Sequence, residues 1–254
     1  MSITSKVFAA AATLTLVGGV GAAAATTASA ATPSCGRTCI DIFSRNYGTH
    51  HHASFVLDVW RHGARVGQPV ILFRTSTSDP AEDFTVAYQG RVSDFASAGL
   101  MSPPLALHYG GGCETFSTHT RACTKHFPDN FAYEIQYAPY GVDSGLCVGT
   151  ATTAVQNTPV SLQPCSASAK TVWVVDVTPS TGRSFFNRYV PLINGSGTNV
   201  SHPFVLTYPK NGFPADTPRP QLLTQKVQQF SDRFVKGGTV YANQQWGADP
   251  GPLS

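Results

Sequence analysis

Few residues of this chain could carry out acid–base catalysis. Asp and Glu together number 14 in 254 residues, and a glycoside hydrolase needs a pair of them flanking the bond that it cleaves. The sequence has no H-E-x-x-H or P-loop motif, and in Gly141-Val142-Asp143-Ser144-Gly145 the serine lies one position too late for a nucleophile elbow. The acidic residues available for a pair are Asp58, Asp79, Glu82, Asp83, Asp94, Glu114 and Glu134. Because no spacing singles out two of them, we expect a protein that is not an enzyme.

The N-terminus has the parts of a secretory signal peptide. Lys6 precedes an apolar stretch at 7–25, and Ala28-Ser29-Ala30 fits a cleavage site. We expect residues 1–30 to be removed and residues 31–254 to form a single secreted, extracellular domain. No later stretch of about 18 apolar residues follows, so we expect no membrane span.

The cysteines support export to an oxidising compartment. The mature part contains an even number of them, which indicates disulfides. Pairing of nearest neighbours gives Cys35–Cys39, Cys113–Cys123 and Cys147–Cys165, one of about fifteen possible connectivities. The alternative is a metal site formed by Cys113, His119, Cys123 and His126. Because these spacings fit no standard zinc pattern, we expect neither a metal nor another cofactor.

Charge and composition narrow the range of partners. Charged residues make up 12% of the chain, the net charge is +3 and no Lys/Arg cluster occurs, so we expect no nucleic-acid partner. The low charge also excludes a coiled coil, whereas 42% hydrophobic residues are enough for a packed core.

Short runs of β-branched and aromatic residues, bounded by Gly, Pro, Ser or Thr, predict strands. These runs are 55–60, 70–73, 131–137, 172–175 and 204–206. Their spacing is typical of an all-β sandwich or barrel rather than of alternating strands and helices. One segment differs, because apolar residues from Leu223 to Phe234 follow a helical period and predict a short helix.

An internal repeat refines this fold class. The sequence proline, apolar residue, any residue, leucine recurs at 69–72, 159–162 and 203–206. The first interval is about twice the second, which predicts an insertion at about 96–130. That segment is rich in Gly, Ser and His and contains Cys113 and Cys123.

The middle repeat resembles one repeat of the ricin B-type β-trefoil lectins. The family pattern runs G-L-C-V-D, N-G-x-x-[IV]-Q-L-x-x-C and Q-x-W. This chain has Gly145-Leu146-Cys147-Val148, then Thr158 to Cys165, then Val172-Trp173. The resemblance implies a β-trefoil of three pseudo-repeats and a disulfide between Cys147 and Cys165.

The outer repeats follow by analogy with the middle one. The three repeat cores are expected at about 55–85, 131–176 and 189–222. Gln244-Gln245-Trp246 is a literal Q-x-W, but it closes the third repeat only if a second insertion precedes it.

The resemblance also implies a sugar site in the first repeat. Such a site needs a carboxylate that accepts hydrogen bonds from sugar hydroxyls, an aromatic ring over the apolar face of the sugar, and a further polar side chain. By position these are Asp58, Phe73 and Glu82, with Glu82 at the Gln position of Q-x-W. In the second repeat Gly149 and Gln163 replace the carboxylate and the ring, so we expect no site there.

The third repeat offers only weaker candidates, Asn194 for the carboxylate and Tyr208 for the ring. The sequence therefore predicts a secreted lectin-like protein with one weak carbohydrate site. Two alternatives remain. The chain could bind a protein partner, for example as a protease inhibitor, through loop 96–130, or it could be an extracellular hydrolase with an unrecognised site.

Overall fold

The structure is a computed structural model that describes residues 39–45, 55–76, 79–166, 168–176, 189–209, 221–227, 240 and 242–250. The expected signal peptide and Cys35 lie outside the described residues. Among the described residues, no helix is long and apolar enough to cross a membrane.

The pairings of six strands form a closed ring. Neighbours pair antiparallel in the order β1–β4–β7–β10–β11, and β14 pairs with β1. A bridge between Val190 and Trp246 joins the β11 segment to β14 and completes the ring. These strands are β1 (Ile40–Ser44), β4 (Phe84–Arg91), β7 (Phe131–Tyr137), β10 (Val172–Val175), β11 (Leu192–Asn194) and β14 (Trp246–Pro250).

The other strands of the large sheet form three hairpins. They are β2 (Phe55–Val59) with β3 (Val70–Arg74), β8 (Leu146–Thr150) with β9 (Thr158–Pro164), and β12 (Phe204–Thr207) with β13 (Leu223–Lys226). The hairpins lie side by side, because Leu223 pairs with Pro159 and Pro69 pairs with Ser161. The molecule therefore consists of three units of four strands, β1–β4, β7–β10 and β11–β14.

Two tryptophan side chains show that these units are equivalent. The indole Nε1 of Trp173 donates to the carbonyl of Val148 at 2.8 Å, and that of Trp246 donates to the carbonyl of Leu206 at 2.8 Å. Trp246 is the first residue of β14 and Trp173 the second residue of β10, the fourth strands of their units, and each acceptor lies in a second strand. Phe84 holds the corresponding place in the first unit, so the Gln244-Gln245-Trp246 motif does close the third repeat.

The proline-based alignment of the third repeat was wrong. Pro69 and Pro159 lead into or lie within the third strands of their units, whereas Pro203 precedes β12, a second strand. Proline before a buried strand thus recurs in two non-equivalent places, and the third unit extends well beyond residue 222.

One hydrophobic cluster fills the ring. Leu57, Val148 and Leu206 come from the second strands, and Trp173 and Trp246 are fully buried between the units. Burial of large apolar side chains of this kind is the main stabilising contribution to such a fold.

The insertion between the first and second units runs from the end of β4 to the start of β7, slightly longer than expected. Two short helices, α1 (Val92–Ser97) and α2 (Pro103–Tyr109), begin it. Phe95 and Leu105 pack with Val174 and Val205, apolar residues of β10 and β12 in a second cluster. The sequence did not predict these helices, because six or seven residues are too few for a clear helical period.

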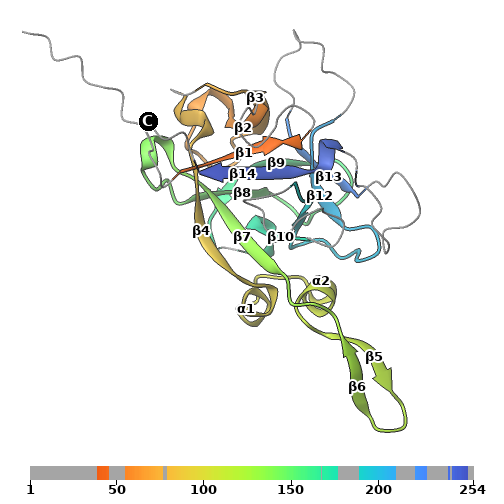
Figure 1. Cartoon of the computed structure of the whole chain (residues 1–254). Coiled ribbons are helices and arrows are strands. Elements are labelled where there is room, and N and C mark those ends of the chain that lie inside the picture. The colour runs from red at the N-terminus through yellow and green to blue at the C-terminus, as the bar shows by residue number, and fades with distance from the viewer. Residues whose placement is uncertain are drawn as a thin grey trace, which may run out of the picture. The chain divides into compact units, whose positions relative to one another are not determined.

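A two-stranded hairpin, β5 (Cys113–Ser117) with β6 (Ala122–His126), completes the insertion. We call it the arm. Figure 1 shows that it extends beyond α1 and α2, away from the ring strands. Its residues are half-buried or exposed throughout. A disulfide between Cys113 and Cys123 joins its strands, which excludes the zinc site considered for these cysteines.

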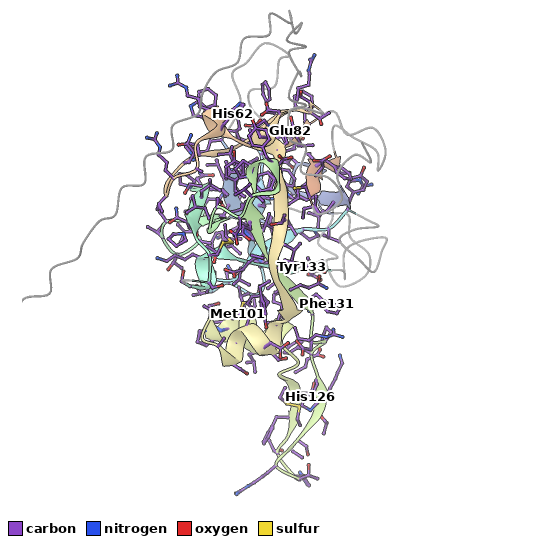
Figure 2. The ribbon with its side chains drawn as sticks, turned by 90° about the vertical axis from the view of Figure 1, so that its left-hand side faces the viewer. His62, Glu82, Met101, His126, Phe131 and Tyr133 are labelled. Atoms are coloured by element: carbon purple, nitrogen blue, oxygen red, sulfur yellow. A yellow bond between two sulfur atoms is a disulfide. The ribbon has the colours of Figure 1, made fainter. Side chains whose placement is uncertain are left out.

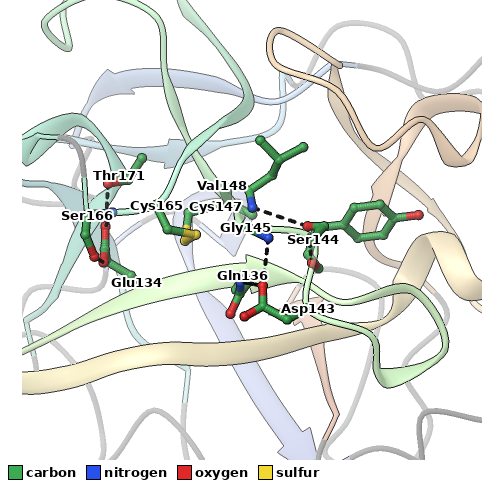
Figure 3. The surroundings of a disulfide bond; sticks show 12 residues. Glu134, Gln136, Asp143, Ser144, Gly145, Cys147, Val148, Cys165, Ser166 and Thr171 are labelled. Atoms are coloured by element: carbon green, nitrogen blue, oxygen red, sulfur yellow. Dashed lines mark hydrogen bonds between the residues drawn. A yellow bond between two sulfur atoms is a disulfide. The ribbon is translucent and has the colours of Figure 1, made fainter. Parts of the chain in front are cut away.

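The second disulfide joins Cys147 and Cys165 across β8–β9, as the family resemblance implies. Beside it the buried carboxylate of Glu134 accepts hydrogen bonds from the backbone and hydroxyl of Ser166 and from Thr171 Oγ1, at 2.6 to 2.8 Å (Figure 3). Cys39 is disulfide-bonded as well, but its expected partner Cys35 lies outside the described residues.

The expected strands at 55–60, 70–73, 131–137, 172–175 and 204–206 are confirmed by β2, β3, β7, β10 and β12. The short helix expected from Leu223 is wrong in its first turn, since Leu223–Lys226 is β13. Its pairing with β12 and β9 supplies backbone hydrogen bonds that the helical pattern could not foresee. The rest of that segment, through Phe234, lies outside the described residues.

Candidate functional site

Strand register identifies the equivalent positions of the three hairpins. Leu57 pairs with Leu72, Val148 with Leu162, and Leu206 with Thr224. The residue after each second-strand member of these pairs stands where the resemblance places the carboxylate: Asp58, Gly149 and Thr207. The residue after each third-strand member stands at the aromatic position: Phe73, Gln163 and Gln225.

The first unit alone therefore carries both a carboxylate and an aromatic ring. Asp58 pairs with Ile71, and Phe73 lies two residues along the same strand. Because side chains alternate along a strand, Asp58, Ile71 and Phe73 share one face of the β2–β3 hairpin. This face is opposite to that of Leu57 and Leu72, which belong to the core of the ring.

The structure corrects both candidates of the third repeat. Asn194 lies in β11, a first strand, and is completely buried; its amide donates to the carbonyl of Lys170 and its oxygen accepts from Ser196. Tyr208 is 2% exposed and packs in the core against Trp246. Thr207 and Gln225 stand at the binding positions instead, so the third unit lacks both a carboxylate and a ring.

Three carboxyl groups meet beside the first hairpin. The carboxyl oxygens of Asp58, Asp79 and Glu82 all lie within 4.8 Å of one another, and we call them the acidic cluster. Asp79 and Glu82 come from the turn before β4, where η4 (Pro80–Glu82) forms a short 3₁₀ helix capped by Asp79. Asp58 and Glu82 are 4% and 3% exposed. The expected convergence of these two residues is thus present, but inside the surface rather than on it.

Each turn residue of the acidic cluster has hydrogen-bond donors. Glu82 accepts from the backbone of Ser76 at 2.9 Å and from Thr75 Oγ1 at 3.1 Å. Asp79 accepts from the backbone of Ala81, and His62 Nε2 lies 3.4 Å from its carboxylate. Figure 2 shows His62 and Glu82 together at the same end of the molecule.

Burial raises the pKa of Glu82 from 4.5 to about 8. The negative charges of Asp41 and Asp79 raise it further, while the donors at Ser76 and Thr75 partly oppose the shift. Glu82 is therefore protonated at neutral pH and can donate a hydrogen bond, like the Gln that usually stands at this position.

The third unit shows what the usual pair looks like. Gln244 is equivalent to Glu82, and its Nε2 donates to the hydroxyl of Thr207 at 3.1 Å. Thr207 is equivalent to Asp58. The neutral carboxyl of Glu82 beside Asp58 therefore corresponds to the amide of Gln244 beside the hydroxyl of Thr207. Among the described residues, the acidic cluster is also the group that could hold a metal ion. Both oxygens of Glu82 already accept hydrogen bonds from the protein. Protonation of Glu82 also lowers the negative charge of the cluster, so its burial does not require a bound cation.

Two hollows are lined in part by Trp60, a residue that the sequence did not single out. One has a volume of about 310 Å³ and is lined by Trp60, Arg61, Gly63, Ala64, Arg65 and Gln68; we call it the arginine hollow. The other, about 190 Å³, is lined by Trp60, Pro69, Ile71 and Gln221. Trp60 follows Asp58 by two residues, so the strand alternation could have indicated its side.

The other acidic residues that the sequence singled out have structural roles. Asp94 accepts from the backbone of Arg91 at the start of α1, and Glu114 pairs with Lys125 across the arm. The backbone of Tyr140 donates to Asp83 at 2.8 Å. Together with Glu134 beside its disulfide, these contacts leave Asp58, Asp79 and Glu82 as the acidic residues that converge.

A ring of six strands with three hairpins, in three equivalent units, defines the architecture. The chain has a β-trefoil fold. No family model and no curated protein matches the sequence.

Solved structures resemble the β-trefoil at low sequence identity. They include a designed threefold-symmetric protein, ThreeFoil, at 12% identity and a TM-score of 0.46, covering 84% of this chain and 98% of that one. The Rhizoctonia solani agglutinin matches at 14% identity and a TM-score of 0.39, covering 83% and 94%. The Polyporus squamosus lectin matches at 10% and 0.43, covering 84% of this β-trefoil and 49% of the lectin chain. No residue role is carried over from these proteins.

Proposed function

We propose that this β-trefoil is a secreted carbohydrate-binding protein that uses the outer face of its first hairpin. The observation that carries the proposal is that Asp58 and Phe73 occupy the two binding positions, whereas the equivalent positions elsewhere hold Gly149 and Gln163, or Thr207 and Gln225. A single site of this kind binds weakly by itself, because lectins gain avidity from several sites.

Each proposed residue has one task. Asp58 accepts hydrogen bonds from sugar hydroxyls, which are strong because the acceptor is charged. Phe73 is half-buried and presents its ring on the same face. Protonated Glu82 lies next to Asp58 and orients it, as Gln244 orients Thr207. Because Asp58 is 4% exposed, the ring and the hollow beside Ile71 provide most of the contact area.

The disulfides support secretion. The Cys113–Cys123 bond lies in the exposed arm, where the thiols would stay reduced in a cytosolic environment. Expression with residues 1–30 in a secreting host tests this part of the proposal. N-terminal sequencing of the exported protein should begin at Ala31, and retention in the cell would contradict it.

Glycan binding before and after single substitutions tests the site. Phe73→Ala and Asp58→Asn should each abolish binding to the glycans that the unmodified protein captures on an array. Gln163→Ala, the equivalent change in the second unit, should leave binding intact and is the matched control. Binding that survives both Phe73→Ala and Asp58→Asn in folded variants would refute the site.

A hydrolase is the second candidate, favoured by one observation. The carboxyl oxygens of Asp58 and Glu82 lie within 4.8 Å of each other, and Glu82 has the raised pKa of a general acid. Against it, both groups are almost fully buried and the hollows border Trp60. Release of reducing ends from a bound polysaccharide, lost in Glu82→Gln, would establish this alternative.

The arm favours a third candidate, a protein partner. Its residues are half-buried or exposed, and Phe116 is 59% exposed. Replacing residues 113–126 by a short Gly-Ser linker should abolish capture of such a partner and leave glycan binding unchanged. Unchanged glycan binding is also what the proposed site in the first hairpin predicts, so loss of partner capture is the result that would establish this candidate.

A further inference from the structure

The arginine hollow lies on the flank of the proposed sugar site, in the first unit. Trp60 forms one wall of it and also borders the second hollow, which contains Ile71 on the Asp58 face. The positions equivalent to Trp60 are Ala151 and Pro209 in the other units. Trp60 thus borders both hollows.

The hollow contains a positioned guanidinium group. Arg65 Nε donates to Gln68 Oε1 at 2.8 Å, and Gln68 Nε2 donates to the carbonyl of Trp60. Gln68 is 3% exposed, so this chain of contacts is fixed by a buried amide. Gly63 makes room for it, because a Cβ atom there would lie 2.6 Å from Gln68 Cδ. An arginine held in place before binding loses less side-chain entropy when it meets an anion.

A second guanidinium group lies over the indole. The Arg61 guanidinium is 5.5 Å from the centroid of the Trp60 ring. Arg61 and His62 both have left-handed backbone conformations, with φ of 55° and 56°. Such a conformation is strained for residues other than glycine and is concentrated at ligand sites. The contact between His62 and Asp79 ties this turn to the acidic cluster.

Both arginines are available to an anion. Within the part of the chain that the structure describes, the ion pairs are His62–Asp79 and Lys125–Glu114, and neither Arg61 nor Arg65 has a carboxylate within 4.0 Å. Two guanidinium groups next to an indole ring suit a ligand that is both acidic and flat on one face. A pyranose bearing an acidic group has both properties, since arginine binds carboxylate or sulfate through paired N–H donors.

We propose that the arginine hollow binds the acidic group of a charged saccharide, with Trp60 against its ring. This inference rests on the proposed carbohydrate function and specifies its ligand class. The neutral neighbour of the charged unit then occupies the hollow beside Ile71, within reach of Phe73 and Asp58.

Matched pairs of oligosaccharides test the proposal by titration calorimetry. Trigalacturonate is compared with its carboxyl-reduced galactose trimer, and a sulfated galactose disaccharide with the unsulfated one. The charged member of one pair should bind at least about tenfold more tightly than its neutral partner. The pair that shows the preference identifies carboxylate or sulfate as the group recognised.

Single substitutions assign the preference to the hollow. Arg65→Gln and Arg61→Gln should each remove most of the preference and leave binding of the neutral member unchanged. Gly63→Ala should weaken the charged member in the same way by displacing Gln68. Arg121→Gln at the tip of the arm removes the same charge elsewhere and should have no effect.

The outcomes separate this inference from the proposed function. Equal affinity for charged and neutral members, or a preference that survives Arg61→Gln and Arg65→Gln, overturns the inference while the Asp58 site stands. A preference lost in Arg65→Gln, together with affinities for both members that Asp58→Asn leaves unchanged, supports the hollow and overturns the role of Asp58. If neither pair binds at all, the inference is overturned, while the glycan array decides the proposed function separately.

Discussion

Replacing Glu82 by glutamine should change how the stability of the protein depends on pH. Between pH 4.5 and about 8 the folded protein keeps a proton on Glu82 that the unfolded chain has lost. Raising the pH through this window therefore lowers the free energy of unfolding of the natural protein. Glutamine does not ionise, so Glu82→Gln should remove this part of the pH dependence.

The size of the effect follows from the pKa. One pKa unit corresponds to about 1.4 kcal/mol, so a rise from 4.5 to about 8 sets a ceiling of about 5 kcal/mol. Because water and neighbouring groups relax around a newly formed buried charge, we expect about half of this ceiling. The variant should equal the natural protein near pH 5 and exceed its stability by about 2–3 kcal/mol at pH 8.

The third unit indicates why glutamine should fit. Ser76 and Thr75 both donate to Oε2 of Glu82, so the one oxygen of glutamine can accept from both, and its amide can donate to Asp58 as Gln244 donates to Thr207. Loss of the charge therefore leaves no buried group without a partner, which is the usual cause of destabilisation.

Urea unfolding at pH values from 5 to 9, with disulfides intact, measures this difference. Tryptophan fluorescence reports unfolding, because Trp173 and Trp246 are fully buried in the core. Glu114→Gln is the control, since that carboxylate is paired with Lys125 in the exposed arm and should change stability by under about 1 kcal/mol at every pH. Parallel pH profiles for Glu82→Gln and the natural protein would refute the buried, protonated state of Glu82.

Three further predictions concern other parts of the structure. Glu134→Gln should lower the free energy of unfolding by about 1–3 kcal/mol, because an amide nitrogen replaces an oxygen that faces hydrogen-bond donors; an unchanged urea midpoint would contradict this. Trp246→Phe should cost a similar amount by leaving the Leu206 carbonyl unpaired, and equal stability would count against the bond. Replacing both Cys113 and Cys123 by serine removes only this disulfide. It should increase amide exchange in the arm, because an isolated hairpin is marginal in water, and change the free energy of global unfolding by less than about 0.5 kcal/mol.

The strands of the first two units could be predicted from sequence because their signals are local. β2, β3, β7 and β10 combine β-branched or aromatic residues with clear boundaries, and burial enforces the pattern. Helix α1 gave no such signal, since most of its stability comes from Phe95 packing on the trefoil. That contact depends on residues far away in the sequence, which no local pattern contains.

The third unit failed for a different reason. Proline before an apolar run marks entry into a buried strand, and it does so at β12 as well as at β3. Distinguishing the two requires the pairing of Leu206 with Thr224 and the bond from Trp246, which join residues separated by long segments. The Q-x-W motif was the better guide, because a buried indole needs one defined acceptor while a proline does not.

The equivalent positions are occupied differently in each unit, which is why we propose a site only in the first. The third unit joins Thr207 to Gln244, a neutral pair that is satisfied and buried. In the second unit a Cβ atom at Gly149 would lie 2.8 Å from the carbonyl of Lys170, so no larger residue fits there without moving the backbone. In the first unit Asp58 lies beside Glu82, whose pKa is raised to about 8 by burial and by its acidic neighbours. Buried polar groups that strain their surroundings in this way are retained where a ligand uses them, and the hollows beside Trp60 border the same face.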